Sequence, residues 1–163
     1  MGTSGEITVL LADDHPVVLQ GLEALLSRRP GLKVVGTATD GPEAVAAVLS
    51  ARPTVAVLDV RMPGCDGLEA TRRILAVYPE ARIIILSGAE EPTAAMDAFR
   101  AGAIGFLPKA SFAKFLVEGI HLAAEGKAVV TDDLVTWLVH TLRDQPEPPT
   151  APPPSPSASV KAG

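Results

Sequence analysis

Short apolar runs alternate with longer amphipathic stretches along the first 130 residues. Apolar residues within the runs are often consecutive, which is typical of strands covered on both faces of a sheet. The stretches between them space their apolar residues helically, as Val18, Leu22 and Leu25 show. The predicted strands are Ile7–Ala12, Leu32–Ala38, Val55–Leu58, Arg82–Leu86 and Gly105–Leu107.

Five strands alternating with five helices predict an α/β domain over residues 1–130, with a parallel sheet and helices on both faces. Pro16 suits the first turn of a helix, and Gly31 follows the end of one. A further helical pattern, with Leu134, Leu138 and Leu142 on one face, predicts an additional helix over residues 131–144.

Residues 145–163 have a different composition. They hold seven of the chain's fifteen prolines, and Val160 is their only large apolar residue. Such a segment cannot bury enough surface to offset its ordering entropy. It is predicted to be a disordered linker or tail.

The length, composition and net charge of the chain limit the class of protein to which it can belong. Of the 163 residues 47% are hydrophobic, enough for one domain core, yet no apolar run approaches the roughly 18 residues that span a bilayer. The N-terminus does not look like a signal peptide, and Cys65, the only cysteine, excludes an internal disulfide. We therefore expect a cytoplasmic protein. A formal net charge of −5 argues against nucleic-acid binding by this chain itself.

Several of the apolar runs lead into polar residues at the end of the strand. The first strand ends in Asp13 and Asp14, the third in Asp59, the fourth in Ser87, and the fifth in Lys109. In such sheets the functional cleft lies beyond the carboxyl ends of the strands. If the strands are neighbours, these five side chains converge on one edge of the sheet.

Three carboxylates in one place repel each other, and the pKa of at least one rises. A divalent cation such as Mg²⁺, which prefers oxygen ligands, relieves this, and with one lysine the formal charges sum to zero. Asp59 beside a cation is then arranged to accept a phosphoryl group as an aspartyl phosphate. Ser87 and Lys109 are placed to interact with the new phosphoryl oxygens.

Taken singly, each of these residues has an ordinary structural explanation. An aspartate after a strand is commonly a turn former, and Asp14 is a candidate helix cap. His15, His121 and His140 lack metal-ligand spacing and are interpreted as structural or solvated, and Cys65 as a small loop hydrophobe. Only the combination, in this order along the chain, points to a site.

The blocks LLADDHPVVLQGLEALL, AVLDVRMPGCDGLEATRRI, IIILSGAEE and AGAIGFLPKAS occur in that order. With them the chain resembles the receiver domain of bacterial two-component response regulators over roughly residues 6–127. The resemblance implies a flavodoxin-like (CheY-like) doubly wound five-stranded sheet in the order 2-1-3-4-5. It also implies that Asp59 is the phosphoacceptor and that Asp13 and Asp14 form the acidic pocket. Mg²⁺ would be bound by Asp14, Asp59 and the backbone carbonyl of Arg61.

The same resemblance assigns the switch. The Ser87 hydroxyl would close on the phosphoryl group, Lys109 would be the lysine of the motif, and Phe106 would be the switch aromatic, here without a hydroxyl. The phosphodonor would be a sensor histidine kinase, and phosphorylation could bring two copies together. The chain would not be an enzyme, apart from at most its own dephosphorylation, and no membrane partner is implied.

Two segments narrow the resemblance. DDHPVVLQGL and GFLPKAS look like the subgroup of receivers that carry a C-terminal LuxR-type helix-turn-helix. This implies transcription regulation through a DNA-binding domain absent from this chain. Pro108 precedes Lys109 and Ala110 follows it, which fits the subgroup and leaves open whether a cis peptide occurs nearby.

Three alternatives remain at this point. A haloacid-dehalogenase-type phosphatase needs a second acid two residues after Asp59, where this chain has Arg61. A flavodoxin-like cofactor binder needs a phosphate-cradling loop after the first strand, where Asp13 and Asp14 would repel phosphate. The third is a stand-alone receiver that acts by binding another protein.

Overall fold

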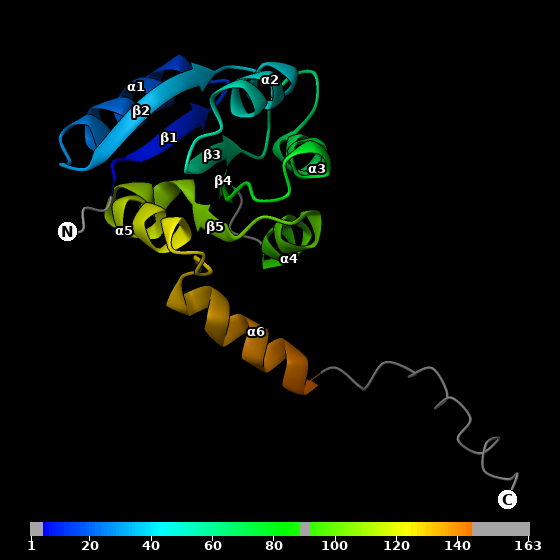
Figure 1. Cartoon of the computed structure of the whole chain (residues 1–163). Coiled ribbons are helices and arrows are strands. Elements are labelled where there is room, and N and C mark those ends of the chain that lie inside the picture. The colour runs from blue at the N-terminus through cyan, green and yellow to red at the C-terminus, as the bar shows by residue number, and fades with distance from the viewer. Residues whose placement is uncertain (1–4, 89–91, 145–163) are drawn as a thin grey trace, which may run out of the picture. The chain divides into compact units, whose positions relative to one another are not determined.

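The computed structural model describes residues 5–88 and 92–144 (Figure 1). The chain divides into two units, residues 1–131 and 132–163. The second unit contributes one described helix, α6, Asp132–Asp144, whose first turn holds two aspartates beside the positive end of the helix dipole. The predicted linker at 145–163 lies outside the described residues.

The first unit alternates strands and helices, as the apolar pattern predicts. The strands are β1 Ile7–Ala12, β2 Leu32–Ala38, β3 Val55–Asp59, β4 Ile83–Ser87 and β5 Gly105–Pro108. The helices are α1 Pro16–Ser27, α2 Gly41–Ala51, α3 Gly67–Val77, α4 Pro92–Ala101 and α5 Phe112–Ala124, and a 3₁₀ turn, η1, spans Lys109–Ser111.

All five strands are parallel, in the order β2-β1-β3-β4-β5. Helices α1 and α5 share a core with alternate residues of the central strands, while α2, α3 and α4 pack in a row against the other face (Figure 1). Every residue of β3 and β4 is buried, as expected of strands covered on both faces. The predicted fold and strand order are therefore confirmed.

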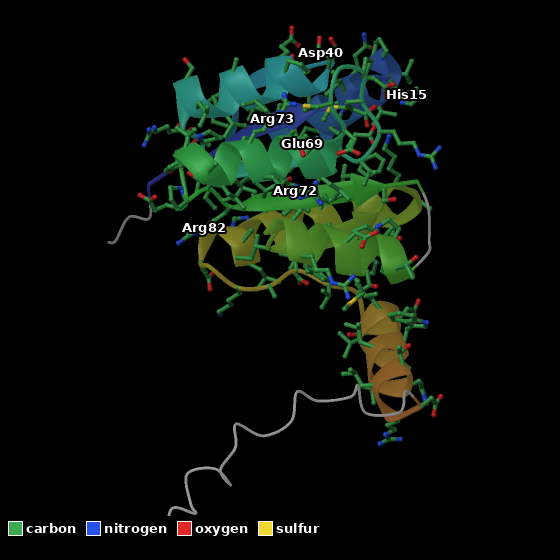
Figure 2. All side chains as sticks on the ribbon, turned by 90° about the vertical axis from the view of Figure 1, so that its right-hand side faces the viewer. His15, Asp40, Glu69, Arg72, Arg73 and Arg82 are labelled. Carbon is green, nitrogen blue, oxygen red and sulfur yellow. The ribbon has the colours of Figure 1, made fainter. Side chains whose placement is uncertain are left out.

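Asp59 and Ser87 are the last residues of β3 and β4, as predicted, whereas Asp13 and Lys109 come directly after the ends of β1 and β5. Strand β4 begins at Ile83, one residue later than the predicted Arg82. The Arg82 guanidinium donates a hydrogen bond to the carbonyl of Ala124 at the end of α5 (Arg82 is labelled in Figure 2). Arg82 therefore caps a helix C-terminus, where cations are favourable.

Side-chain caps fix where two helices begin. The Asp40 carboxylate accepts a 2.7 Å hydrogen bond from the backbone N–H of Glu43 at the start of α2. Asp66 does the same for Glu69 at the start of α3, also at 2.7 Å. Figure 2 labels Asp40 and Glu69 at these helix starts. Both caps satisfy backbone N–H groups that would otherwise lack a partner, so the loops before α2 and α3 end at fixed residues.

Candidate metal and phosphoacceptor site

The register of the sheet brings the polar strand ends together. Ala12 pairs with Leu58, so the residues that follow them, Asp13 and Asp59, are neighbours at the same edge. Ser87 pairs with the last residue of β5, immediately before the predicted lysine. The sheet thus places Asp13, Asp59, Ser87 and the lysine at one edge, as parallel strands require.

Lys109 lies between two of the carboxylates. Its Nζ is 2.8 Å from Asp13 Oδ2 and 3.2 Å from Asp59 Oδ1. The side chains of Asp13, Asp59 and Lys109 are 0%, 3% and 20% exposed, so these ion pairs are largely withdrawn from water. Screening by solvent is weak there, and the lysine is the main counter-charge that the described residues supply to the two acids.

Burial sets the protonation of Asp59 and Lys109. Burial raises the pKa of Asp59, and the nearby charge of Asp13 raises it further, while Lys109 and a backbone hydrogen bond from Arg61 oppose the rise. Burial alone would lower the pKa of Lys109, but its hydrogen bonds and charge interactions with Asp13 and Asp59 outweigh that effect and raise it. Lys109 therefore stays positively charged beside an unusually basic carboxylate.

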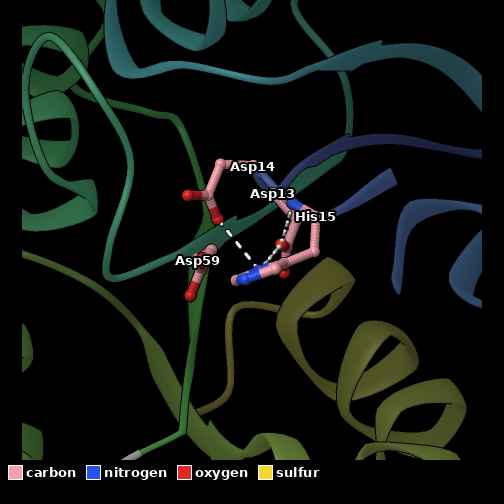
Figure 3. A group of neighbouring side chains, drawn as sticks. All are labelled: Asp13, Asp14, His15 and Asp59. Carbon is pink, nitrogen blue, oxygen red and sulfur yellow. Dashed lines mark hydrogen bonds and ion pairs between the residues drawn. The ribbon is translucent and has the colours of Figure 1, made fainter. Parts of the chain in front are cut away.

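Asp14 and His15 complete the cluster from the turn after β1 (Figure 3). The side chain of Asp14 is 31% exposed, and its Oδ1 is 3.0 Å from Nδ1 of His15. The same nitrogen is 3.1 Å from Asp13 Oδ1. The histidine spacing in the sequence does not predict a ligand role for His15, whose place before Pro16 suits a helix start. Its position directly after two acids at a strand end was the signal that could have placed it at the site.

A divalent cation fits the donor set. Asp13, Asp14, His15 and Asp59 each offer one ligand atom, and these atoms lie within 4.8 Å of one another. The buried Oδ2 of Asp59 has no hydrogen-bond partner among the described residues. A buried carboxylate oxygen without a partner is costly, and a cation would satisfy it. The cluster is therefore able to hold a metal ion.

The other predicted residues lie after β3 or on β4 and β5. The backbone of Arg61 hydrogen-bonds to the Asp59 carboxylate, which places this residue beside the site. Ser87 and Phe106 are 3% and 4% exposed, on the neighbouring strands β4 and β5. No cis peptide bond occurs in the described part of the chain, Pro108 and Ala110 included.

Gly67, to which the sequence pattern assigns no role, holds the loop after β3 in place. Its backbone N–H donates to the carbonyl of Val60 at 2.7 Å. A Cβ at Gly67 would lie 2.2 Å from the backbone oxygen of Asp59. Only glycine permits this approach, so α3 begins directly against the backbone of the proposed phosphoacceptor.

Comparison with known proteins agrees with this geometry. The sequence pattern of the family described as "Response regulator receiver domain" matches residues 9–121. The chain belongs to this receiver-domain family. Among solved structures it is similar to a LuxR-family two-component response regulator from Aurantimonas sp. SI85-9A1, with a TM-score of 0.82 and 34% identity over 86% of this chain and all of that chain. It is also similar to the signal receiver domain of the putative response regulator NarL from Mycobacterium tuberculosis. The TM-score there is 0.72 and the sequence identity 34%, over 76% of this chain and all of that chain.

Several curated relatives of this receiver are named as transcriptional regulators. The DNA-binding transcriptional activator DevR/DosR of Mycobacterium tuberculosis is 38% identical over 86% of this chain and 65% of its own length. The transcriptional regulatory protein YxjL of Bacillus subtilis is 35% identical over 76% of this chain and 57% of its own length. The resemblance to LuxR-type receivers is thereby confirmed, and this chain spans less than two thirds of either relative.

None of the helices in residues 5–88 and 92–144 is long and apolar enough to cross a bilayer.

Proposed function

We propose that this receiver accepts a phosphoryl group on Asp59 from a phosphohistidine of a sensor histidine kinase. The observation that carries the proposal is the unpartnered, buried Oδ2 of Asp59 beside a lysine and two further acids. A carboxylate oxygen attacks the phosphorus, the O–P bond forms, and the P–N bond to the kinase histidine breaks. The bonding electrons stay on the imidazole nitrogen, which takes a proton from water.

The chain's own residues would prepare this step. Burial makes Asp59 more basic than an ordinary aspartate, and Lys109, already within 3.2 Å, would pair with the new phosphoryl oxygens. Asp13 holds the lysine in place at 2.8 Å. A bound Mg²⁺, held by Asp14, Asp59 and the backbone carbonyl of Arg61, with Asp13 in the acidic pocket, would supply charge neutralisation. Ser87 would hydrogen-bond to the phosphoryl group and Phe106 would respond as the switch aromatic.

The receiver would control transcription through a DNA-binding output domain, to which residues 145–163 would connect it. Its signal would come from contact with the histidine kinase in the cytoplasm. Relatives named as transcriptional regulators, longer than this chain, support this assignment. Homodimerisation on phosphorylation would be one way to pass the signal on. The receiver would turn over no external substrate.

Labelling with a small phosphodonor tests the function. Intact-mass measurement in the presence of Mg²⁺ should show one added phosphoryl group. Asp59→Asn should abolish the addition, while Asp97→Asn, an exposed aspartate on α4, should leave it unchanged. Asp14→Ala should weaken Mg²⁺ binding measured by calorimetry. Unchanged labelling of Asp59→Asn would refute the assignment.

A further inference from the structure

The turn after β1 brings an imidazole into a cluster otherwise made of carboxylates. Figure 3 shows the His15 side chain beside Asp13 and Asp14, with Asp59 opposite. Nδ1 of His15 lies 3.1 Å from Asp13 Oδ1 and 3.0 Å from Asp14 Oδ1. The four side chains offer three oxygen ligands and one nitrogen ligand within 4.8 Å of one another. The cluster therefore differs in donor chemistry from an all-oxygen site.

Local backbone geometry holds His15 in this position. Its N–H donates to Asp13 Oδ1 at 2.8 Å, and the Asp13 side chain is fully buried and paired with Lys109. His15 is also the N-cap residue of α1, and the fixed ring of Pro16 follows at the first helical position. The backbone of His15 is thus fixed on both sides, and its ring has only to rotate to present Nδ1 to an ion.

The imidazole ring of His15 lies on the solvent-exposed side of the cluster. The side chain of His15 is 64% exposed, whereas those of Asp13 and Asp59 are 0% and 3% exposed. An ion seated on the buried carboxylates would complete its coordination from the exposed side, with waters. Nδ1 of His15 lies on that side, beside Asp14, and is able to replace one of those waters.

Divalent cations differ in how strongly they bind an imidazole nitrogen. Mg²⁺ is small and hard, takes oxygen ligands and keeps several waters, so an imidazole adds little to its binding. Co²⁺ and Ni²⁺ bind imidazole well, and their affinity for mixed nitrogen and oxygen sites exceeds that of earlier first-row divalent ions. One nitrogen ligand therefore changes the selectivity of the site more than its Mg²⁺ affinity.

We propose that His15 is a nitrogen ligand for late first-row divalent cations at the phosphoacceptor site, and that it sets the selectivity of this receiver between such cations and Mg²⁺. The inference rests on the proposed function for the metal site itself. Asp59 Oδ2, buried and without a hydrogen-bond partner among the described residues, is the independent sign that the cluster receives a cation. His15 adds the ligand that distinguishes one cation from another.

Calorimetric titration of tag-free protein at one fixed pH tests this, with Mg²⁺ and Ni²⁺ measured separately. His15→Gln should weaken Ni²⁺ binding by about tenfold or more and leave Mg²⁺ binding within about twofold. His121→Gln, an exposed histidine on α5, is the matched control and should change neither constant. The visible absorption of bound Co²⁺ should also change in His15→Gln alone, since a nitrogen ligand is lost. That second readout involves no phosphorylation.

The possible outcomes separate this inference from the metal site. If Asp59→Asn and Asp14→Ala both weaken Mg²⁺ and Ni²⁺ binding while His15→Gln weakens only Ni²⁺, the inference holds. If His15→Gln leaves Ni²⁺ binding and the Co²⁺ spectrum unchanged, or weakens both cations equally, His15 is not the selective ligand. If neither aspartate substitution affects Mg²⁺ binding, the proposed metal site fails as well.

Discussion

The backbone N–H of Phe106 donates a 2.9 Å hydrogen bond to the carbonyl of Val129. Val129 in turn donates to the carbonyl of Ile104 at 3.0 Å, so the segment after α5 pairs with β5 as a short parallel bridge. Strand β5 is the last strand of the sheet, and this bridge covers its outer edge. The strand that carries the proposed switch aromatic is thus bonded directly to the chain that leads out of the domain.

Close packing beneath Val129 predicts the effect of a single methyl group. A Cβ at Gly105 would lie 2.6 Å from the Cβ of Val129 and 3.2 Å from Ile84 Cγ1. We expect Gly105→Ala to lower the free energy of unfolding by about 1–3 kcal/mol, since overpacking forces neighbours apart. Urea unfolding gives the value.

Two variants make this measurement specific. Gly21→Ala lies on an exposed face of α1 with nothing within 4 Å of the added Cβ, so it should instead stabilise the protein by about 0.5–1 kcal/mol. Val129→Gly in the Gly105→Ala background should recover part of the loss, since it removes the Cβ that would lie 2.6 Å from the added methyl group. Strict additivity of Gly105→Ala and Val129→Gly would show that the two positions do not interact.

The shifted pKa of Asp59 predicts a stability that depends on pH. Because burial and Asp13 raise its folded pKa above the ordinary 3.8, the folded protein loses stability as pH rises through the interval between the two values. Above that interval Asp59 is ionised in both states, and its burial lowers the free energy of unfolding by the full amount. In metal-free buffer, Asp59→Asn should therefore melt at a higher temperature than wild type at neutral pH.

That advantage should shrink as pH falls through the folded pKa of Asp59, and it should be smallest below pH 3.8, where Asp59 is protonated in both the folded and the unfolded state. Asp97→Asn on α4 is the control, since Asp97 is 56% exposed, and should show a much smaller difference. Thermal unfolding over a pH series in chelator provides the test. An Asp59→Asn protein less stable than wild type at neutral pH would contradict the burial argument.

Much of this architecture follows from the sequence. Consecutive apolar residues located all five strands, because strands covered on both faces tolerate few polar positions. Ser87 ends β4, and although it is polar it is small enough to be buried at 3% exposure. The predicted start of β4 is one residue too early, because the guanidinium of Arg82 hydrogen-bonds to the carbonyl of Ala124, 42 residues further on. Strand order came from the family resemblance, since periodicity contains no information on it.

The site divides in the same way. The acids and the lysine were predictable, because chain direction alone puts the ends of parallel strands at one edge. The position of His15 directly after two acids is a sequence signal for the site, but its contact with them depends on a turn in which its own N–H bonds to Asp13. Gly67 was not predictable, since its importance lies in a contact with the backbone of Asp59 rather than in any side chain.

Lys109 is predicted to be the main stabiliser of the acidic site in the absence of metal. Lys109→Met removes the positive partner of Asp13 at 2.8 Å and of Asp59 at 3.2 Å. Breaking a buried pair in this way should lower the free energy of unfolding by about 3 kcal/mol. The raised pKa of Lys109 means that this contribution is complete below pH 10.5 and is lost only as pH rises through the folded value.

Comparison with two other conditions checks this assignment to Lys109. Asp59→Asn in the Lys109→Met background should recover part of the lost stability, since one unpaired charge disappears. Saturating Mg²⁺ should stabilise Lys109→Met more than wild type. Lys114→Met, on α5, is the matched control and should have little effect in either condition. A Lys109→Met protein as stable as wild type without metal would show that water, not the lysine, compensates the acids.

Ser87 is predicted to link the phosphorylated site to β5 and the bridge beyond it. Ser87 is the last residue of β4, buried, and paired in register with Pro108 at the end of β5. Phosphorylation of Asp59 should draw the Ser87 hydroxyl inward and let the Phe106 side chain move. This movement should change the hydrogen bond from the Phe106 N–H to the carbonyl of Val129. In wild type the exchange rates of the Phe106 and Val129 amides, measured by NMR, should therefore change on phosphorylation. Ser87→Ala should still take up the phosphoryl group but leave those rates nearly unchanged, and Ser27→Ala, at the end of α1, should behave as wild type. Equal changes in Ser87→Ala and wild type would show that the signal reaches β5 by another route.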